Sequence, residues 1–516
     1  MRPTTLVRLA LAGTRTDGLR VLLTAFSALL ATLAALAAAT VLAIPTPGPP
    51  GMTGSDAWSK QYRNALLAEP GLRPGVAITM LLLMIPILAL AGQCARLGAP
   101  ARDRRLAAIR LAGATPGQTV LLAVAEAGLA SLFGSAAGLA TYLVGRRLLD
   151  RPGADGKLAL PTDVLPPAWV LAVVVLGLPL LAALATAILL RRVTVSPFGT
   201  VRSTTRTRAP GSLPGILIVL GLVVIGAAKP LYEWYGRTDR EPPVWLFATL
   251  LAGGSLLAML GVVTGAAWIS YTVGRLLHRT ARRPAALLAA RRLLADPWSG
   301  SRTFTALLAC LIFGAGAAAF RAYFVTTDEV RAEMQRLDAE ANGLPPVMVE
   351  PDPFYVQTMD LINIAVVVAM IIAAGGLLVA VAEGIVSRRR TYAALVATGV
   401  PRRTLGRSIA WQVLAPALPA ILVAVTVGQV LGRMAGGDRV TERTGSCDPA
   451  VSGPVCQDPE KAWQHTRWTE VSRVVDVPLE QLALLGGGAL AAVLATVAIG
   501  LLFLRASTTI EELRVG

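Results

Sequence analysis

The sequence predicts an all-α integral membrane protein with about ten transmembrane helices. The 516 residues are 54% hydrophobic and only 15% charged, and the mean hydropathy is +0.61, whereas a soluble domain of this size carries roughly a quarter charged residues. The apolar residues are also clustered into runs of about 20, long enough to cross a bilayer core of about 30 Å. Such runs form helices, because backbone polar groups cannot stay unpaired in lipid.

Ten apolar runs follow one another along the chain. They are Val21–Ile44, Val76–Ala95, Val120–Leu143, Trp169–Leu190, Leu213–Ala228, Val244–Val273, Thr303–Val325, Leu361–Val386, Ser408–Leu431 and Leu479–Leu504. The first run has about 24 residues, too many for the apolar core of a secretory signal, so we expect it to be retained as a helix. The fifth run is the shortest and the weakest candidate.

The charges between the runs predict the orientation. Loops on the N-terminal side hold 29 of the 48 Lys and Arg but only 7 of the 31 Asp and Glu. Because basic loops stay in the cytoplasm, we expect both termini to be cytoplasmic. The net charge of +17 then reflects topology and lipid headgroups. We expect no nucleic-acid binding.

An internal repeat organises the chain. Arg104–Ala114 recurs 286 residues later as Arg390–Val400, in both cases within a basic loop between two apolar runs. The runs therefore divide as four, two and four, with expected boundaries at residues 1–208, 209–280 and 281–516. Because each repeat crosses four times, both have the same orientation and are related by an axis along the membrane normal.

Each copy of the repeated segment predicts a short amphipathic helix. Gly113 and Gly399 end the two helices, and Pro116 and Pro401 follow them, as expected for a glycine stop and the start of the next helix. An isolated helix of this kind would most simply rest on lipid headgroups. Its repetition at equivalent positions favours a shared docking role.

The cysteines fall into two pairs. Cys447 and Cys456 flank a polar stretch in a loop that the charge pattern places outside the cell. An oxidising exterior favours a disulfide between them. Cys94 and Cys310 lie in or beside apolar runs, where a packing role is expected.

Residues for catalysis or metal binding are scarce. The two histidines, His278 and His465, are far apart, and neither belongs to a cluster with zinc-ligand spacing. No phosphate-binding loop of the form Gly-x-x-x-x-Gly-Lys-Ser/Thr and no credible nucleophile elbow occurs. We expect no enzyme activity and no bound cofactor, so if ATP drives the protein, another chain binds it.

Polar and small residues inside the runs indicate helix packing. Glu126 is an intramembrane charge in the third run, and such residues are costly in lipid. A packing or boundary role is favoured over transport, because a proton-coupled carrier usually needs a relay of carboxylates. The pairs Gly134/Gly138 and Gly261/Gly265 predict close helix contacts.

At the repeated loop the sequence resembles the FtsX-like permease family. Arg104–Thr115, followed by Glu126, is similar to the family signature: a charged cytoplasmic segment ending in leucine, a variable pair and Gly-Ala, then a span with a glutamate. The Arg192–Arg202 segment resembles the pattern that follows the fourth span. The resemblance covers both four-span units.

The sequence also departs from the family pattern. Arg105 and Thr391 stand where the family usually has a glutamate, and Gln412 occupies the place equivalent to Glu126. The ten-span arrangement is similar to the BceB-type branch, but the large extracellular domains of the BceB-type and MacB-type members are missing. Recognition of a partner through such a domain is therefore not expected.

The resemblance implies the permease subunit of an ABC transporter in a bacterial plasma membrane. ATP and Mg would bind to a separate ATPase, present in two copies, and the repeated segments would be its coupling helices. The implied coupling residues are Arg104, Arg105, Ile109, Arg110, Gly113, Arg389, Arg390, Leu395 and Gly399.

The resemblance also implies a mode of action. ATPase motion would be transmitted across the membrane, and a lipophilic or amphipathic compound would be exported or extracted. One alternative is a mechanical regulator that relays the motion to a cell-envelope partner without transporting anything. An ion-driven secondary carrier is a third hypothesis, disfavoured by the missing carboxylate relay.

Overall fold

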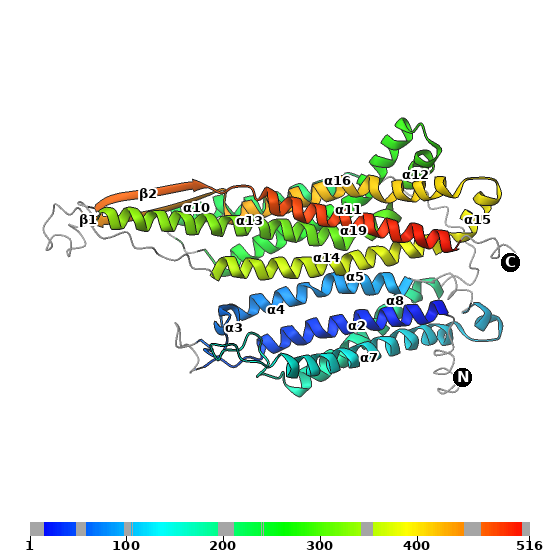
Figure 1. Cartoon of the computed structure of the whole chain (residues 1–516), viewed down its shortest axis with the longest axis horizontal. Helices are drawn as coiled ribbons and strands as arrows, with labels where there is room; N and C mark the ends of the chain where they lie inside the picture. Colours follow the sequence, from blue (N-terminus) through cyan, green and yellow to red (C-terminus); the bar gives the residue numbers. More distant parts are fainter. Residues whose placement is uncertain are drawn as a thin grey trace.

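A computed structural model describes residues 15–47, 58–96, 105, 107–194, 211–238, 240, 242–341, 354–386, 388–447 and 466–507. This part of the chain forms an elongated helical bundle with one β-hairpin (Figure 1). It contains ten helical spans long and apolar enough to cross a membrane, including Leu213–Arg237 at the shortest predicted run. The predicted class, an all-α multi-pass membrane protein, is confirmed.

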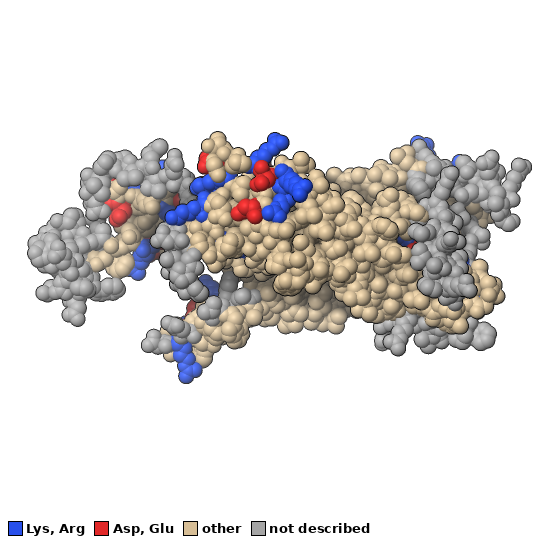
Figure 2. All heavy atoms as spheres, turned by 90° about the horizontal axis from the view of Figure 1, so that it is seen from below, with Lys and Arg blue, Asp and Glu red and all other residues tan. Residues whose placement is uncertain are grey.

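The two ends of the bundle differ. We call the end where α2 (Arg15–Leu42) begins and α19 (Leu479–Ser507) ends the proximal end, and the opposite end, which carries the hairpin, the distal end (Figure 1). Figure 2 shows a wide band with almost no charged side chains between the ends. Such a band matches the hydrocarbon core of a bilayer.

The first four spans form one group of helices. They are α2, the pair α4 (Arg73–Leu82) and α5 (Met84–Arg96), α7 (Pro116–Leu149) and α8 (Ala168–Thr194). α2 packs against each of the others. Gly134 and Gly138 of α7 lie directly against the α2 backbone at Ala25 and Leu29, where a side-chain carbon would clash. The predicted close contact at this glycine pair is confirmed.

The last four spans repeat this arrangement. They are α13 (Pro297–Ala341), α14 (Phe354–Val386), α16 (Arg402–Gly436) and α19. α13 packs against α16 as α2 packs against α7. Gly428 and Gly432 of α16 lie against the α13 backbone at Ile312 and Gly316. Both halves therefore join their first and third spans through small residues, because only these let two helix backbones approach closely.

The central helices pack on the last four spans. They are α9 (Leu213–Gly226), α10 (Ala228–Arg237), α11 (Val244–Thr280) and α12 (Pro284–Ala295). α11 contacts α9, α13 and α16, and Gly261 fits against Pro214 and Ile218 of α9, while Gly265 also faces Pro214. The second predicted glycine contact is thus confirmed. The domain boundaries remain a prediction.

The two halves meet through their second spans. α5 lies beside α14 (Figure 1), and the backbone at Leu90 approaches Gly376. The largest apolar core lies among α11, α13, α14, α16 and α19, around Leu311, Leu377 and Val493. The second half and the central helices therefore share one core, on which the first half rests.

A distal arm extends from the second half. α13 has 45 residues and is therefore about 67 Å long, roughly twice the thickness of a bilayer core. Two antiparallel strands lie along its distal part, β1 (Arg439–Cys447) and β2 (Thr466–Val474). We call these strands and residues 326–341 the distal arm. The strands of this hairpin were not predicted from the sequence.

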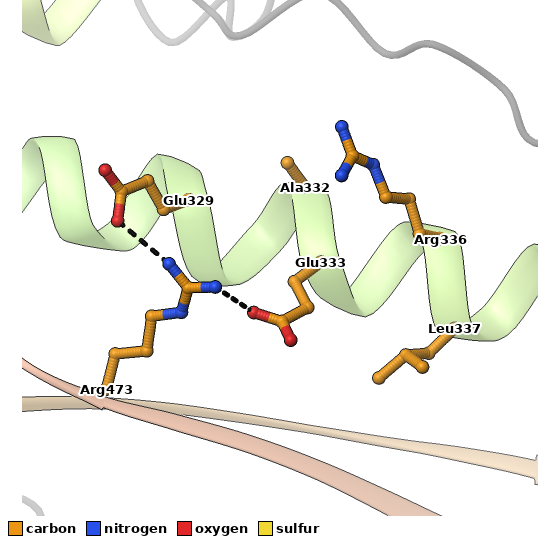
Figure 3. A pocket seen from close by; sticks show the side chains of 6 residues that line it. All are labelled: Glu329, Ala332, Glu333, Arg336, Leu337 and Arg473. Atoms are coloured by element: carbon orange, nitrogen blue, oxygen red, sulfur yellow. Dashed lines mark hydrogen bonds and ion pairs between the residues drawn. The ribbon is translucent and has the colours of Figure 1, made fainter.

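Apolar and charged contacts both fix the hairpin on α13. Val330 and Met334 form a small core with three hairpin-side valines, Val440, Val471 and Val475. Beside this core the guanidinium of Arg473 bonds to Glu329 (3.1 Å) and Glu333 (2.5 Å) in a shallow hollow (Figure 3). These contacts hold the hairpin along the distal part of α13.

A smaller folded unit covers the distal end of the first half. We call residues 58–73 and 150–167 the distal cap. The Tyr62 hydroxyl donates to Asp163 (2.7 Å), and the Arg63 N–H donates to the Leu158 carbonyl (3.0 Å), joining the two loops. The buried Arg73 side chain donates to five oxygens, including the Ile44 carbonyl. Four backbone carbonyls and the Ser59 hydroxyl thus satisfy a guanidinium at the membrane boundary.

Candidate coupling surface and intramembrane ion pair

The first repeated segment ends in a Schellman motif at the proximal end. Residues 107–111 are helical. Gly113 has a φ of 94°, its N–H donates to the Arg110 carbonyl (2.9 Å), and the Ala114 N–H donates to the Ile109 carbonyl (3.2 Å). A positive φ with this pair of bonds caps the last helical turn. The glycine stop predicted at Gly113 is confirmed.

The second segment has the same ending. α15 (Arg389–Ala397) is followed by Gly399 with a φ of 89°. The Gly399 N–H donates to the Val396 carbonyl (3.0 Å), and the Val400 N–H donates to the Leu395 carbonyl (3.0 Å). The two loops therefore share backbone geometry as well as sequence, at the same end of the bundle (Figure 1).

The next helix starts immediately after each loop. Thr115 caps α7 with its hydroxyl, and Gln118 returns a bond to the Thr115 N–H, which makes a capping box. Pro401 is the N-cap residue of α16. Only a few residues therefore separate each short helix from the third span of its half.

Contacts with the bundle core anchor α15. Tyr392 is buried, and its hydroxyl accepts a hydrogen bond from Arg292 of α12 (2.6 Å), whose guanidinium also lies over the Tyr392 ring at 5.7 Å. Leu395 and Val400 pack against the main core. Since α12 leads directly into α13, α15 is tied to the helix that carries the distal arm.

The first segment is more exposed than the second. Leu111 is 90% exposed, and the neighbouring Arg110 is also exposed, with one bond from its Nε to the Thr119 hydroxyl (3.3 Å). Ala397, which corresponds to Leu111, is exposed in the second segment as well. An exposed leucine beside an arginine is suited to protein docking.

The structure accounts for the remaining coupling residues only in part. Arg105 and Ile109 are partly exposed. Arg389 and Arg390 lie in the first turn of α15, but their side chains are outside the described part, as is Arg104. The proposed contacts of these arginines therefore remain predictions.

Glu126 forms an ion pair inside the membrane region. Its carboxylate accepts a bond from Arg20 of α2, and the two side chains are only 10% and 8% exposed. The pair joins the first and third spans near the proximal end. Sequence reasoning missed Arg20 as the partner, although an arginine at the start of the first apolar run was the available signal.

The second half differs at this position. Gln412 replaces the glutamate, and its amide nitrogen lies 3.2 Å from the Ser408 hydroxyl on the same helix. A neutral side chain satisfied within its own helix needs no cation on a neighbouring helix. A charged residue at this position is thus a feature of the first half, although the two halves share their backbone arrangement.

The cysteine and metal predictions have different outcomes. Cys447 ends β1, but its side chain and all of Cys456 are outside the described residues, so the disulfide stays a prediction. Cys94 and Cys310 are buried free thiols, consistent with packing. The described residues contain no group of three His, Cys, Asp or Glu that could hold a metal.

Comparison with known proteins identifies the family. The profile of the FtsX-like permease C-terminal domain matches residues 74–197 and 363–511, just over half of the chain. The first region includes almost all of α4 and the whole of α5, α7 and α8, and the second includes most of α14 together with α15, α16 and α19. No curated protein and no solved structure gives a significant match.

The fold defines a multi-pass membrane protein with two related halves. The chain belongs to the FtsX-like permease family. Members of this family are permease subunits of ABC transporters, typically non-catalytic, and they work with a separate ABC ATPase. The resemblance at Arg104–Thr115 and Glu126 therefore named the right family.

Proposed function

We propose that the chain is the membrane-spanning subunit of an ATP-driven exporter and that two ATPase subunits dock on its proximal end. One would engage residues 107–112 and the other α15. The observation that carries the proposal is the pair of loops that end in the same Schellman motif, at Gly113 and Gly399. Two equivalent docking elements suit two copies of one motor protein.

The charge distribution supports a cytoplasmic proximal end. The termini and loops on the N-terminal side hold 29 of the 48 Lys and Arg, and the described helices that flank them end at the proximal end. Basic loops are retained in the cytoplasm. Both termini would then be cytoplasmic, in a bacterial plasma membrane. ATP and Mg would be bound by the partner and not by this chain.

Mechanotransmission is supported by the connection from α15 to the distal arm. A push on α15 would pass through Tyr392 and Arg292 to α12, and from there along the continuous α13 to the hairpin. Packed helices transmit displacement because protein interiors are hardly compressible. A lipophilic or amphipathic compound would be displaced from the distal leaflet or surface.

The distal arm also supports a second candidate, a mechanical regulator. The arm places a helix and a hairpin roughly 24 Å beyond the span, given a rise of 1.5 Å for each of residues 326–341. An envelope protein bound there would receive the same motion without transport. In liposomes, ATP-dependent extraction of an amphiphile supports the exporter, whereas arm movement without extraction supports the regulator.

Docking is tested by placing a charge on each proposed contact. The full chain is purified with candidate ABC ATPases, and assembly and ATP turnover are measured for Leu111→Asp and Ala397→Asp. Leu337→Asp on the distal arm is the matched control, because that leucine is also exposed. A carboxylate in an apolar contact is costly, so each docking variant should lose at least one ATPase copy.

The stoichiometry gives a decisive outcome. Two ATPase copies on the wild type, one on each single variant and none on the double variant would support two separate docks. Full assembly by the double variant would overturn the assigned surface. If no ATPase assembles with the wild type in nanodiscs, the motor-driven proposal itself fails.

A further inference from the structure

Basic side chains gather on the distal cap. Figure 2 shows Lys and Arg side chains, with Asp and Glu side chains among them, toward the distal end of the face that it draws, next to the uncharged band. Five basic residues of the cap and the adjoining end of α7 are exposed: Lys60, Arg63, Arg147, Arg151 and Lys157. We call them the basic cap.

The acidic residues of the cap neutralise this surface only in part. Asp155 lies 3.7 Å from the guanidinium of Arg63. Asp150 accepts the Thr162 hydroxyl (2.7 Å), and Asp163 accepts the Tyr62 hydroxyl (2.7 Å). Two of the three exposed carboxylates therefore bond to neutral groups. The described residues of the cap and the end of α7 thus expose five basic side chains and three acidic ones, and a fourth carboxylate, Glu69, is only partly exposed.

Short backbone contacts hold the cations on one folded unit. The Lys157 carbonyl accepts the Gly153 N–H (2.9 Å) and thus closes the loop that carries Asp155. The half-buried Arg146 donates to the Thr162 and Asp163 carbonyls, which ties this loop to α7. The basic cap is thus held in place before any ligand binds.

Large apolar side chains are exposed beside the cations. Leu148 is 63% exposed and Trp169 is 69% exposed, and Leu149, Leu160 and Leu165 are exposed as well. Leucines facing water from a loop would be unfavourable, whereas leucine and tryptophan next to arginine are typical of the membrane–water interface. The exposure of these side chains fits a basic cap at headgroup depth.

We propose that the basic cap binds the phosphate headgroups of anionic phospholipid in the distal leaflet. The apolar residues contact the acyl chains, and Arg147, Arg151 and Lys157 face the phosphates. Guanidinium groups bind phosphate oxygens through paired N–H donors. The site is independent of ATPase docking, because it depends only on the charge and exposure of the cap.

Native mass spectrometry of the full chain tests the proposal. Phosphatidylglycerol or phosphatidylcholine is titrated onto the purified protein, and the affinity of each is measured for the wild type and for Arg147→Gln/Arg151→Gln. We expect the wild type to prefer phosphatidylglycerol. The variant should lose about fivefold in that affinity per charge, since each cation near an anionic surface contributes about 1 kcal/mol, with phosphatidylcholine unchanged.

Two matched variants separate charge at the cap from charge in general. Arg336→Gln/Arg439→Gln removes two exposed cations from the distal arm and should keep full phosphatidylglycerol affinity. Arg147→Lys/Arg151→Lys keeps the charge and should retain most of the affinity for phosphatidylglycerol. Equal affinity of the wild type for both lipids overturns the proposal. So does an equal loss in the arm and cap variants, or a cap variant that loses both lipids alike.

Discussion

Arg20 of α2 and Glu126 of α7 form an ion pair between the first and third spans of the first half, and both side chains are about nine-tenths buried. Taking two charges out of water is costly, and their attraction offsets this cost only while both are present. The intact pair therefore stabilises the contact between the two helices, whereas a single remaining charge destabilises it.

Removing one partner of this pair should destabilise the first half strongly. We expect Glu126→Gln or Arg20→Met to lower the free energy of unfolding by about 3 to 5 kcal/mol, because the buried charge that remains loses its partner across the helix contact. The double variant Arg20→Met/Glu126→Leu should recover most of the loss. Thermal unfolding in nanodiscs measures all three.

The second half supplies the control for the ion pair. Gln412→Leu removes only a weak bond to Ser408 within α16, so it should cost about 1 kcal/mol or less. If Gln412→Leu lowers the free energy of unfolding as much as Glu126→Gln does, any polar residue at this depth is equally important. The pair would then have no special role.

The glycines that end the two repeated loops should resist substitution by alanine. Gly113→Ala and Gly399→Ala each place a side chain at positive φ, which costs about 1 to 2 kcal/mol, although nothing lies within 4 Å of the added carbon. Gly117→Ala in α7 also meets open space but has helical backbone, so it should stabilise by up to about 1 kcal/mol.

Thermal unfolding of the three glycine variants shows directly whether each substitution stabilises or destabilises the protein. Destabilisation at Gly113 and Gly399 together with stabilisation at Gly117 supports the left-handed stops. If Gly399→Ala and Gly117→Ala have the same effect, the helix stop at Gly399 is not what fixes the end of α15.

The spans and the repeat were predictable because bilayer physics acts on short stretches of sequence. The length and hydropathy of a run such as Val120–Leu143 are enough to predict its helix. Gly113 and Gly399 occupy the same position in the two copies of the repeat, which predicts that both short helices end in the same way. The ion pair was not predictable in the same way. Glu126 was visible, but its partner Arg20 lies 106 residues away, and only the packing of α2 on α7 brings the two together.

The distal arm was missed for a related reason. β1 and β2 contain charged and polar residues such as Glu442 and Arg473, so their composition is that of a solvated loop. Their strand pairing depends on three valines that meet Val330 and Met334 of α13. This core is assembled from two distant parts of the chain, and no local pattern reports it.

Tyr392 and Arg292 should control the mobility of α15. Tyr392→Phe removes the hydroxyl that accepts from Arg292 but keeps the ring, so it should cost about 1 to 3 kcal/mol locally. Hydrogen exchange of residues 389–399 should become faster, while exchange in residues 107–112 is unchanged. Equal acceleration in both segments would mean that the variant loosens the whole proximal end.

The Tyr62 phenol should make the distal cap sensitive to alkaline pH. Burial, together with the hydrogen bond and charge of Asp163, raises the pKa of Tyr62 above its ordinary value of 10.0. A raised pKa in the folded state stabilises the fold fully below pH 10 and progressively less above it. Unfolding followed from pH 8 to 11 should show this loss in the wild type and less of it in Tyr62→Phe.

The apolar contacts of the distal arm should matter more than its ion pairs. Arg473 bonds to Glu329 and Glu333, but all three side chains are about half exposed, and exposed pairs contribute about 0 to 1 kcal/mol. Met334 is buried in the small core of the arm, and truncating a buried methionine costs about 2 to 5 kcal/mol.

Limited proteolysis of the hairpin ranks the two kinds of contact. Met334→Ala should speed cleavage within β1 and β2 strongly, whereas Arg473→Ala should change it little, and high salt should not matter. Because the core and the ion pairs lie on the same two turns of α13, both variants probe the same docking of the hairpin. Cleavage that is faster in Arg473→Ala than in Met334→Ala would show instead that charge holds the arm together, and added salt should then release the hairpin from the wild type.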